Sequence, residues 1–185
     1  CTANQGDIIV LMPGHAEAIS AAAGVDADVA GVRSVGLGVG VERPTITFDT
    51  IISVDIDIDA AGITFENIVF SANFADITAA IDVNANDFTM INCHFQATAV
   101  DMNFLICIQD HLTTSDRIKI LNCSSKLVDA SDTHFINFAG VGDGHEVRGC
   151  TLIGDWGTMC IGGAGVITFC VITDNIIYNA TTTFD

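Results

Sequence analysis

The chain of 185 residues has few positive charges: six Lys and Arg stand against 23 Asp and Glu, and the formal net charge is −17. Such a surface repels the phosphate backbone of nucleic acids. No apolar run approaches the roughly 20 residues that a membrane-spanning helix needs. The first residues, CTANQGDIIV, lack the basic start and apolar stretch of a signal peptide. We therefore expect neither nucleic acid nor a membrane as a partner.

Proline and helix signals are also scarce. Pro occurs twice, and only residues 15–24, HAEAISAAAG, could form a turn or two of helix. Half of the residues are hydrophobic, which is enough for one domain with a core. The seven cysteines are odd in number, and none has zinc-ligand spacing. We expect free, buried thiols and a reducing site of folding, although a disulfide between adjacent coils is not sterically excluded.

Two phrases of alternating apolar and polar residues recur with a period of about 25 residues, which predicts strands. The copies of the longer phrase are GITFENIVF (62–70), DFTMINCHF (87–95), RIKILNCSS (117–125), HEVRGCTLI (145–153) and VITDNIIYN (171–179). The copies of the shorter phrase are IDIDA (56–60), IDVNA (81–85), ICIQD (106–110), INFAG (136–140) and CIGGA (160–164).

Strands at this period, without hairpin dipeptides between them, predict that each turn of chain stacks in parallel on the next. The predicted fold class is all-β: a right-handed, single-stranded parallel β-helix, or solenoid, of about 6–7 coils. We expect one domain over 1–185, with N-terminal coils or a cap at 1–50 and regular coils at 51–180. The predicted inward residues are Ile56, Ile58, Ile81, Val83, Ile106, Ile108, Ile136 and Phe138, with Ile63, Phe65, Phe88, Met90, Ile118 and Ile120.

Asn or Gly recurs at one position of each long phrase, next to the bend that we expect after the strand. Asn tolerates left-handed backbone, and its amide can bond the equivalent amide one coil away. This pattern predicts a structural ladder at the bend rather than a row of binding residues. The predicted members are Asn67, Asn92, Asn122, Gly149 and Asn175, and Cys93, Cys123 and Cys150 recur beside them.

The strongest candidate site is acidic. Asp55, Asp57 and Asp59 lie on one face of a predicted strand, where Asp82 should stack on Asp57 and Asn84 on Asp59. Such a patch could be a solvated face, bind Ca²⁺ or a subunit, or supply a carboxylate pair for glycoside hydrolysis. We favour the solvated face, and we assign no catalytic, cofactor-binding or metal-ligating residue and no cofactor.

Histidines give weaker hypotheses. His15 with Glu17 could ligate a metal, but no third ligand is near in sequence. His111 lies in the longest insertion and His145 in a second loop, and such loops form a natural contact face. The run Gly36, Gly38 and Gly40 is not followed by a helix pattern, which argues against a nucleotide site.

The segments PGHAEAIS, DVAGVRSVGLGVGVERPTITF, NFADI and AVDMNFL resemble β-helix proteins encoded among the structural genes of tailed bacteriophages and prophages. The resemblance covers roughly residues 6–180. It implies a non-enzymatic virion protein, similar to the trimeric capsid decoration proteins of the head surface, assembled in the host cytoplasm. The implied partners are two further copies and the major capsid protein or another virion protein. Leu105 and Phe135 are candidates for an outward apolar strip that three parallel rods would bury.

Other functions stay open. A receptor-binding tailspike or tail fibre, or a carbohydrate-active β-helix enzyme, would use Asp55–Asp59 and Asp82. Arg117 and Lys119 match one polygalacturonase motif, but the other motifs are missing or out of order, so we interpret them as an outward strand surface. Trp156 and Tyr178 are too few for a typical sugar-binding cleft. A secreted adhesin would need a signal peptide upstream.

Overall fold

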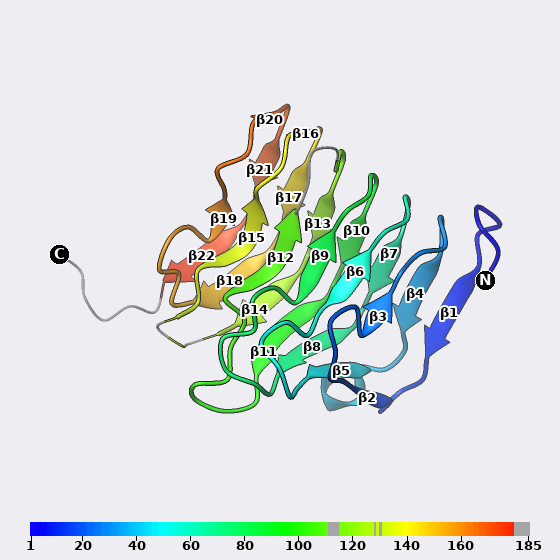
Figure 1. The fold of residues 1–185 in the computed structure, drawn as a ribbon, viewed down its shortest axis with the longest axis horizontal. Helices are drawn as coiled ribbons and strands as arrows, with labels where there is room; N and C mark the ends of the chain where they lie inside the picture. The colour runs from blue at the N-terminus through cyan, green and yellow to red at the C-terminus, as the bar shows by residue number, and fades with distance from the viewer. Residues whose placement is uncertain (111–114, 128, 130, 180–185) are drawn as a thin grey trace.

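The computed structural model of the protein describes residues 1–110, 115–127, 129 and 131–179. Over these residues the chain winds into a parallel β-solenoid of about seven turns, stacked in chain order from the N-terminal to the C-terminal end (Figure 1). A typical turn contributes one short strand to each of three parallel sheets, here called A, B and C. The predicted all-β parallel solenoid is therefore confirmed.

The strands of successive turns pair in register, so equivalent residues form columns through the stack. Sheet A contains β1 (Ile8–Leu11), β4 (Arg33–Gly36), β7 (Thr64–Glu66), β10 (Thr89–Ile91), β13 (Lys119–Leu121), β17 (Glu146–Arg148) and β21 (Val171–Thr173). Sheet B contains β2 (Ala16–Ile19), β5 (Thr45–Phe48), β8 (Val69–Ala72), β11 (His94–Ala97), β14 (Ser124–Lys126), β18 (Thr151–Gly154) and β22 (Ile176–Asn179). Sheet C contains β3 (Val25–Asp26), β6 (Ile56–Ile58), β9 (Ile81–Val83), β12 (Ile106–Asp110), β15 (His134–Phe138) and β19 (Ile161–Gly162).

Three minor elements complete the described chain. The short strands β16 (Gly142–Asp143) and β20 (Ile167–Thr168) pair with each other near the C-terminal end of the stack. A single turn of 3-10 helix, η1, spans Gly40–Glu42. The described residues contain no helix that is long and apolar enough to cross a membrane.

The alternating apolar residues form one continuous core between the three sheets. All the predicted inward residues are buried except Ile106, which is half-buried. Aromatic rings join successive turns, because Phe70 stacks on Phe95 at 5.1 Å and Phe95 meets Phe104 and Phe135 edge-on. Phe135 is fully buried, so its prediction as part of an outward strip is wrong.

As predicted, a left-handed residue turns the chain at the bend between sheets A and B. The φ angles of Asn67, Asn92 and Asn122 are 57°, 52° and 54°, and that of Gly149 is 67°. Nδ2 of Asn92 donates to Oδ1 of Asn67 at 3.1 Å. Each long phrase thus holds two strands rather than one, because this bend divides it.

Two local predictions at the ends of the chain are wrong. The left-handed residue of the last turn is Asp174, with φ 57°, and not Asn175. Asn175 instead continues the cysteine column, where its Oδ1 accepts the N–H of Cys150 at 2.9 Å. Residues 15–24 form no helix, because β2 pairs with β5 and so continues sheet B.

Candidate functional site

The candidate acidic residues lie on the outward face of sheet C. Asp57 pairs with Asp26 of the preceding turn and Asp82 of the next, as predicted for Asp82. Oxygen atoms of Asp55, Asp57 and Asp82 all lie within 4.8 Å of one another, and the three residues are half-buried. Within the part of the chain that the structure describes, this is the only set of three or more His, Cys, Asp or Glu that are so close.

Hydrogen bonds hold the carboxylates of Asp55 and Asp59 on this face. The backbone N–H of Ala23 donates to Oδ1 of Asp55, and Nδ2 of Asn84 donates to Oδ1 of Asp59 at 2.9 Å. Burial raises the pKa of Asp55, and the bond from Ala23 partly offsets this rise. Asp59 therefore stacks with Asn84 as predicted and stands apart from the close set of three.

Three carboxylates at this spacing suit a hard divalent cation. Ca²⁺ takes 6–8 oxygen ligands, and three carboxylates with water can supply them. A separation of about 5 Å also matches the two carboxyl groups of retaining glycosidases. The column changes character in the later turns, where Nδ2 of Asn137 donates to Oε1 of Gln109 at 3.1 Å. The acidic face is thus confined to the N-terminal turns of sheet C.

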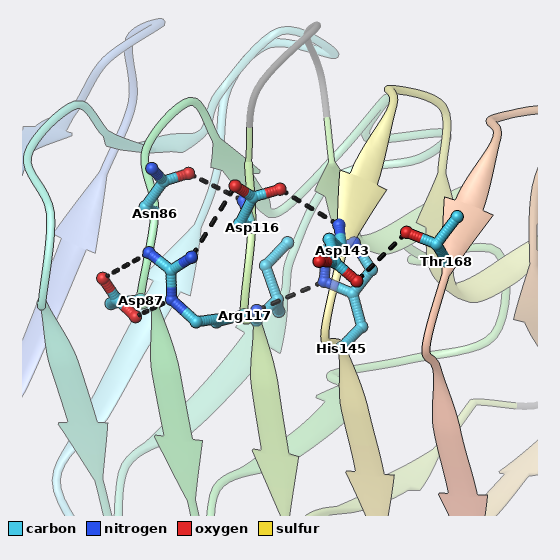
Figure 2. Close-up of polar contacts among 8 residues, drawn as sticks. Asn86, Asp87, Asp116, Arg117, Asp143, His145 and Thr168 are labelled. Atoms are coloured by element: carbon cyan, nitrogen blue, oxygen red, sulfur yellow. Dashed lines mark hydrogen bonds and ion pairs between the residues drawn. The ribbon is translucent and has the colours of Figure 1, made fainter.

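A second row of polar side chains, which we call the ladder corner, follows the corner between sheets C and A (Figure 2). Oδ1 of Asn86 accepts the backbone N–H of Asp116 at 2.7 Å, and Oδ1 of Asp116 accepts the N–H of Asp143 at 3.0 Å. Oδ1 of Asp143 accepts the hydroxyl of Thr168 at 3.0 Å. Each side chain satisfies a donor in the following turn, so the row holds turns together.

Arg117 lies in the same corner. Its φ of 58° places it in the bend before β13, so its prediction as a strand residue is wrong, whereas Lys119 is exposed on the strand. Nε and Nη2 of Arg117 donate to Oδ1 and Oδ2 of Asp87 at 2.6 and 2.9 Å. These bonds lower the pKa of Asp87, and the Asp116 carboxylate lies 3.7 Å from Nη1. The guanidinium therefore joins two turns.

His145 is fully buried behind this row, so its prediction as part of a contact loop is wrong. Its ring stacks on Phe138 at 4.7 Å, and Nδ1 accepts the N–H of Ile118 at 3.2 Å. Nε2 has no hydrogen-bond partner among the described residues. Burial lowers the pKa of His145, while the carboxylates of Asp116 and Asp143 act in the opposite direction. His145 is therefore a neutral residue of the core.

Among the described residues, the other histidines form no common site. His94 is half-buried, with Nδ1 2.8 Å from the hydroxyl of Ser124, and burial is the main cause of its lowered pKa. His134 is buried and also has a lowered pKa. His15 and Glu17 are exposed, and no third ligand joins them within the described residues. His111 lies outside the described residues.

The cysteines and large aromatics serve the core more than a surface. All seven cysteines are free, and Cys93, Cys123 and Cys150 are buried as predicted. Burial raises the pKa of Cys123 well above its usual range, and the adjacent Cys93 adds to this rise. Trp156 is 5% exposed and packs edge-on against Phe135, whereas Tyr178 is exposed on the last strand. Trp156 therefore offers no surface for a sugar ring.

No motif in the sequence marks Asp132, which is 0% exposed and lies between β14 and β15. Its burial becomes visible only when the turns are stacked.

Comparison of the chain with protein-family models, with curated proteins and with solved structures gave no match.

Proposed function

We propose that the protein is a non-enzymatic structural component of a virion, and that it attaches to a capsid surface as a homotrimer. The observation that carries the proposal is the use of polar side chains at the ladder corner. Asn86, Asp116 and Asp143 bond the next turn of the stack instead of converging on a cavity. This arrangement suits a stiff projection, and the resemblance of the sequence to phage β-helix proteins supplies the virion context.

The acidic face supports a second part of the proposal, which is how the protein contacts the capsid. Asp55, Asp57 and Asp82 lie on a chain with a net charge of −17, so two copies repel each other unless this charge is neutralised. A divalent cation or a basic surface of a capsid protein would neutralise it. The face is therefore the proposed contact with the capsid or with a bridging cation.

The trimer contact needs a less charged surface. Ile91 and Leu121 pair with each other on the outward side of sheet A, where both are half-buried. They replace the buried Phe135 as candidates for the apolar strip between parallel rods. Aliphatic residues that are only partly covered in a single chain gain further burial in such a contact.

The test is the native mass of the purified chain by light scattering, with and without EDTA. A trimer supports the proposal, and a trimer that dissociates in EDTA assigns a cation to the acidic face. Leu121→Glu should dissociate the trimer, whereas Val100→Glu, at a residue 78% exposed in a loop, should leave it intact. A monomer at all concentrations contradicts the proposal of a trimeric decoration protein.

A carbohydrate-active protein is the second candidate, because the carboxylates of Asp55, Asp57 and Asp82 are close enough for glycosidase chemistry. It predicts sugar release from a bacterial surface polysaccharide. Asp57→Asn and Asp82→Asn should abolish this release, and Asp101→Asn, the same change at an exposed residue in a loop, should not. Equal release by all the variants rules out this site.

A further inference from the structure

A buried polar cluster lies at the corner between sheets B and C, away from the acidic face and the ladder corner. Its members, which we call the inner cluster, are Asn103, Asp132 and Trp156, and they are 1%, 0% and 5% exposed. They come from three successive turns. The N–H of Gly157 donates to the carbonyl of Asp132 at 2.7 Å, which places Trp156 beside Asp132 in the adjoining turn. The turns that carry Asp132 and Trp156 are thus hydrogen-bonded to each other beside these two buried residues.

The polar atoms of the inner cluster are only partly satisfied. Oδ1 of Asn103 accepts the N–H of Asp76 at 2.8 Å, which leaves its Nδ2 for Asp132. Nδ2 of Asn103 and the backbone N–H groups of Asp129 and Asp155 approach the Asp132 carboxyl group and lower its pKa. None of the three reaches good hydrogen-bond geometry, and Nε1 of Trp156 also has no partner among the described residues. The carboxyl oxygens of Asp132 are therefore buried without the well-aligned donors that an ionised carboxylate needs.

The charges around Asp132 favour its neutral form. Burial is the main cause that raises its pKa from 3.8 to about 7, and the Asp129 carboxylate adds to the rise. The thiol of Cys107 is close to Asp132, and that of Cys160 is close to Cys107. Burial raises the pKa of both thiols, that of Cys160 to about 12, so they stay uncharged near neutral pH. Asp155 contributes only its backbone N–H. No Lys or Arg is among the groups that shift this pKa.

We propose that the inner cluster is a proton-binding site, which holds a proton on Asp132 while the corner between sheets B and C is closed and loses it as the corner opens to water. The proposal does not depend on the virion function. An ionised carboxyl group in an apolar interior must be rehydrated or paired, and neither is available while the corner stays closed.

The stability of the folded chain should depend on pH through Asp132. Because the folded pKa of Asp132 lies above the unfolded one, its contribution to stability is fully present below about pH 4 and is lost as the pH rises through about 7. The corner should therefore be tighter at pH 6 than at pH 8.

The fluorescence of Trp156 reports on the inner cluster, because Trp156 is the only tryptophan of the chain. We would record its fluorescence emission between pH 5 and pH 9. The expected result is one sigmoid shift to longer wavelength with a midpoint near 7, as water reaches the indole ring. Asp132→Asn keeps the shape of the side chain but cannot ionise, so its emission should not change with pH.

Matched variants separate Asp132 from its titrating neighbours. Asp129→Asn should keep the transition and move its midpoint to lower pH, since the charge that raises the pKa of Asp132 is gone. His134→Gln should keep the midpoint, because His134 is a near neighbour in sequence but not a cause of the shift. A flat wild-type curve, or a transition that persists in Asp132→Asn, overturns the proposal.

A direct titration covers the case in which Asp132→Asn fails to fold. The ¹³Cγ chemical shift of Asp132 in the labelled wild-type protein should titrate near pH 7. A midpoint near 4, the ordinary value for Asp, overturns the proposal.

Discussion

At the ladder corner, carboxylate and amide side chains lie near the surface and bond the next turn, whereas at the corner between sheets B and C the polar groups are buried. Asn86, Asp116 and Asp143 each accept a hydrogen bond from the following turn. At the second corner, Nδ2 of Asn103 and both carboxyl oxygens of Asp132 are left without well-aligned partners. At the ladder corner, polar side chains hydrogen-bond successive turns to each other. At the corner between sheets B and C, a polar group is buried in the core.

The difference teaches where a solenoid tolerates irregularity. A repeated surface contact costs little desolvation, so each turn can add one without penalty. A buried carboxyl group must be neutral or well bonded, so Asp132 should make its corner sensitive to pH. The ladder corner nevertheless has its own buried titratable group, His145, which lies behind the row. The two corners can therefore be tested with the same kinds of substitution.

Gly→Ala at each corner should give the largest contrast. A Cβ atom on Gly142 would overlap Nε2 of the buried His145 and lie 2.9 Å from the carbonyl oxygen of Ser115. We expect Gly142→Ala to lower the free energy of unfolding by about 3 kcal/mol, because the ring cannot move away within the core. Gly157→Ala, whose Cβ would lie 3.4 Å from the carbonyl oxygen of Asp132, should be nearly neutral. Urea unfolding measures both, and equal losses contradict this account of the corners.

His145 should contribute to the loss of stability in acid, in the same direction as His94 and His134 and opposite in sign to Asp132. Burial lowers its folded pKa, so its contribution is present above the unfolded pKa of about 6.5 and is lost as the pH falls through the folded value. His145→Asn should cost about 2–3 kcal/mol at pH 7.5 through lost packing on Phe138. It should also flatten the fall in stability between pH 7 and pH 5.

The measurement of His145 needs two controls. The Asp132→Asn background removes the opposite pH dependence of the inner cluster, provided that this variant folds. His15→Asn changes an exposed histidine and should leave the loss of stability in acid unchanged. If His145→Asn loses as much stability on acidification as the wild type does, the contribution assigned to His145 is contradicted.

The fold was predictable because stacking repeats a local rule. Alternation fixed which of Phe65, Met90 and Ile120 face inward, and left-handed Asn residues marked the bend between sheets A and B. The last turn shows the limit of this logic, because Asp174 and Asn175 are adjacent and either could take the bend. Only the pairing of Thr173 with Arg148 places Asp174 there.

The candidate sites were predictable only where they obey the same register. Asp82 stacks on Asp57 because both follow the repeat. His145 and Asp132 lie in connecting segments, where length and direction vary from turn to turn. Their burial depends on neighbours such as Phe138 and Asn103, which the local sequence cannot place.

Asp116 tests the ladder corner as a connector. Asp116→Ala removes the acceptor of the Asp143 N–H, and the loss of such a cap costs about 1 kcal/mol. Asp116→Asn keeps an acceptor oxygen and should cost much less. Urea unfolding of both variants gives the comparison, and equal losses would show that the charge of Asp116 matters more than its hydrogen bond.

The smallest effect should come from Arg117, whose side chain is exposed at the ladder corner. Its bonds to Asp87 join two side chains that are 48% and 49% exposed, so water and salt screen the attraction. We expect Arg117→Gln to change stability by an amount close to the error of the measurement at 0.15 M salt and by more at 0.01 M. Asp87→Asn should show the same salt dependence, since either change removes the same pair. A large loss at high salt would mean that Arg117 positions the left-handed bend itself, and the ladder corner would then rest on backbone geometry more than on its polar contacts.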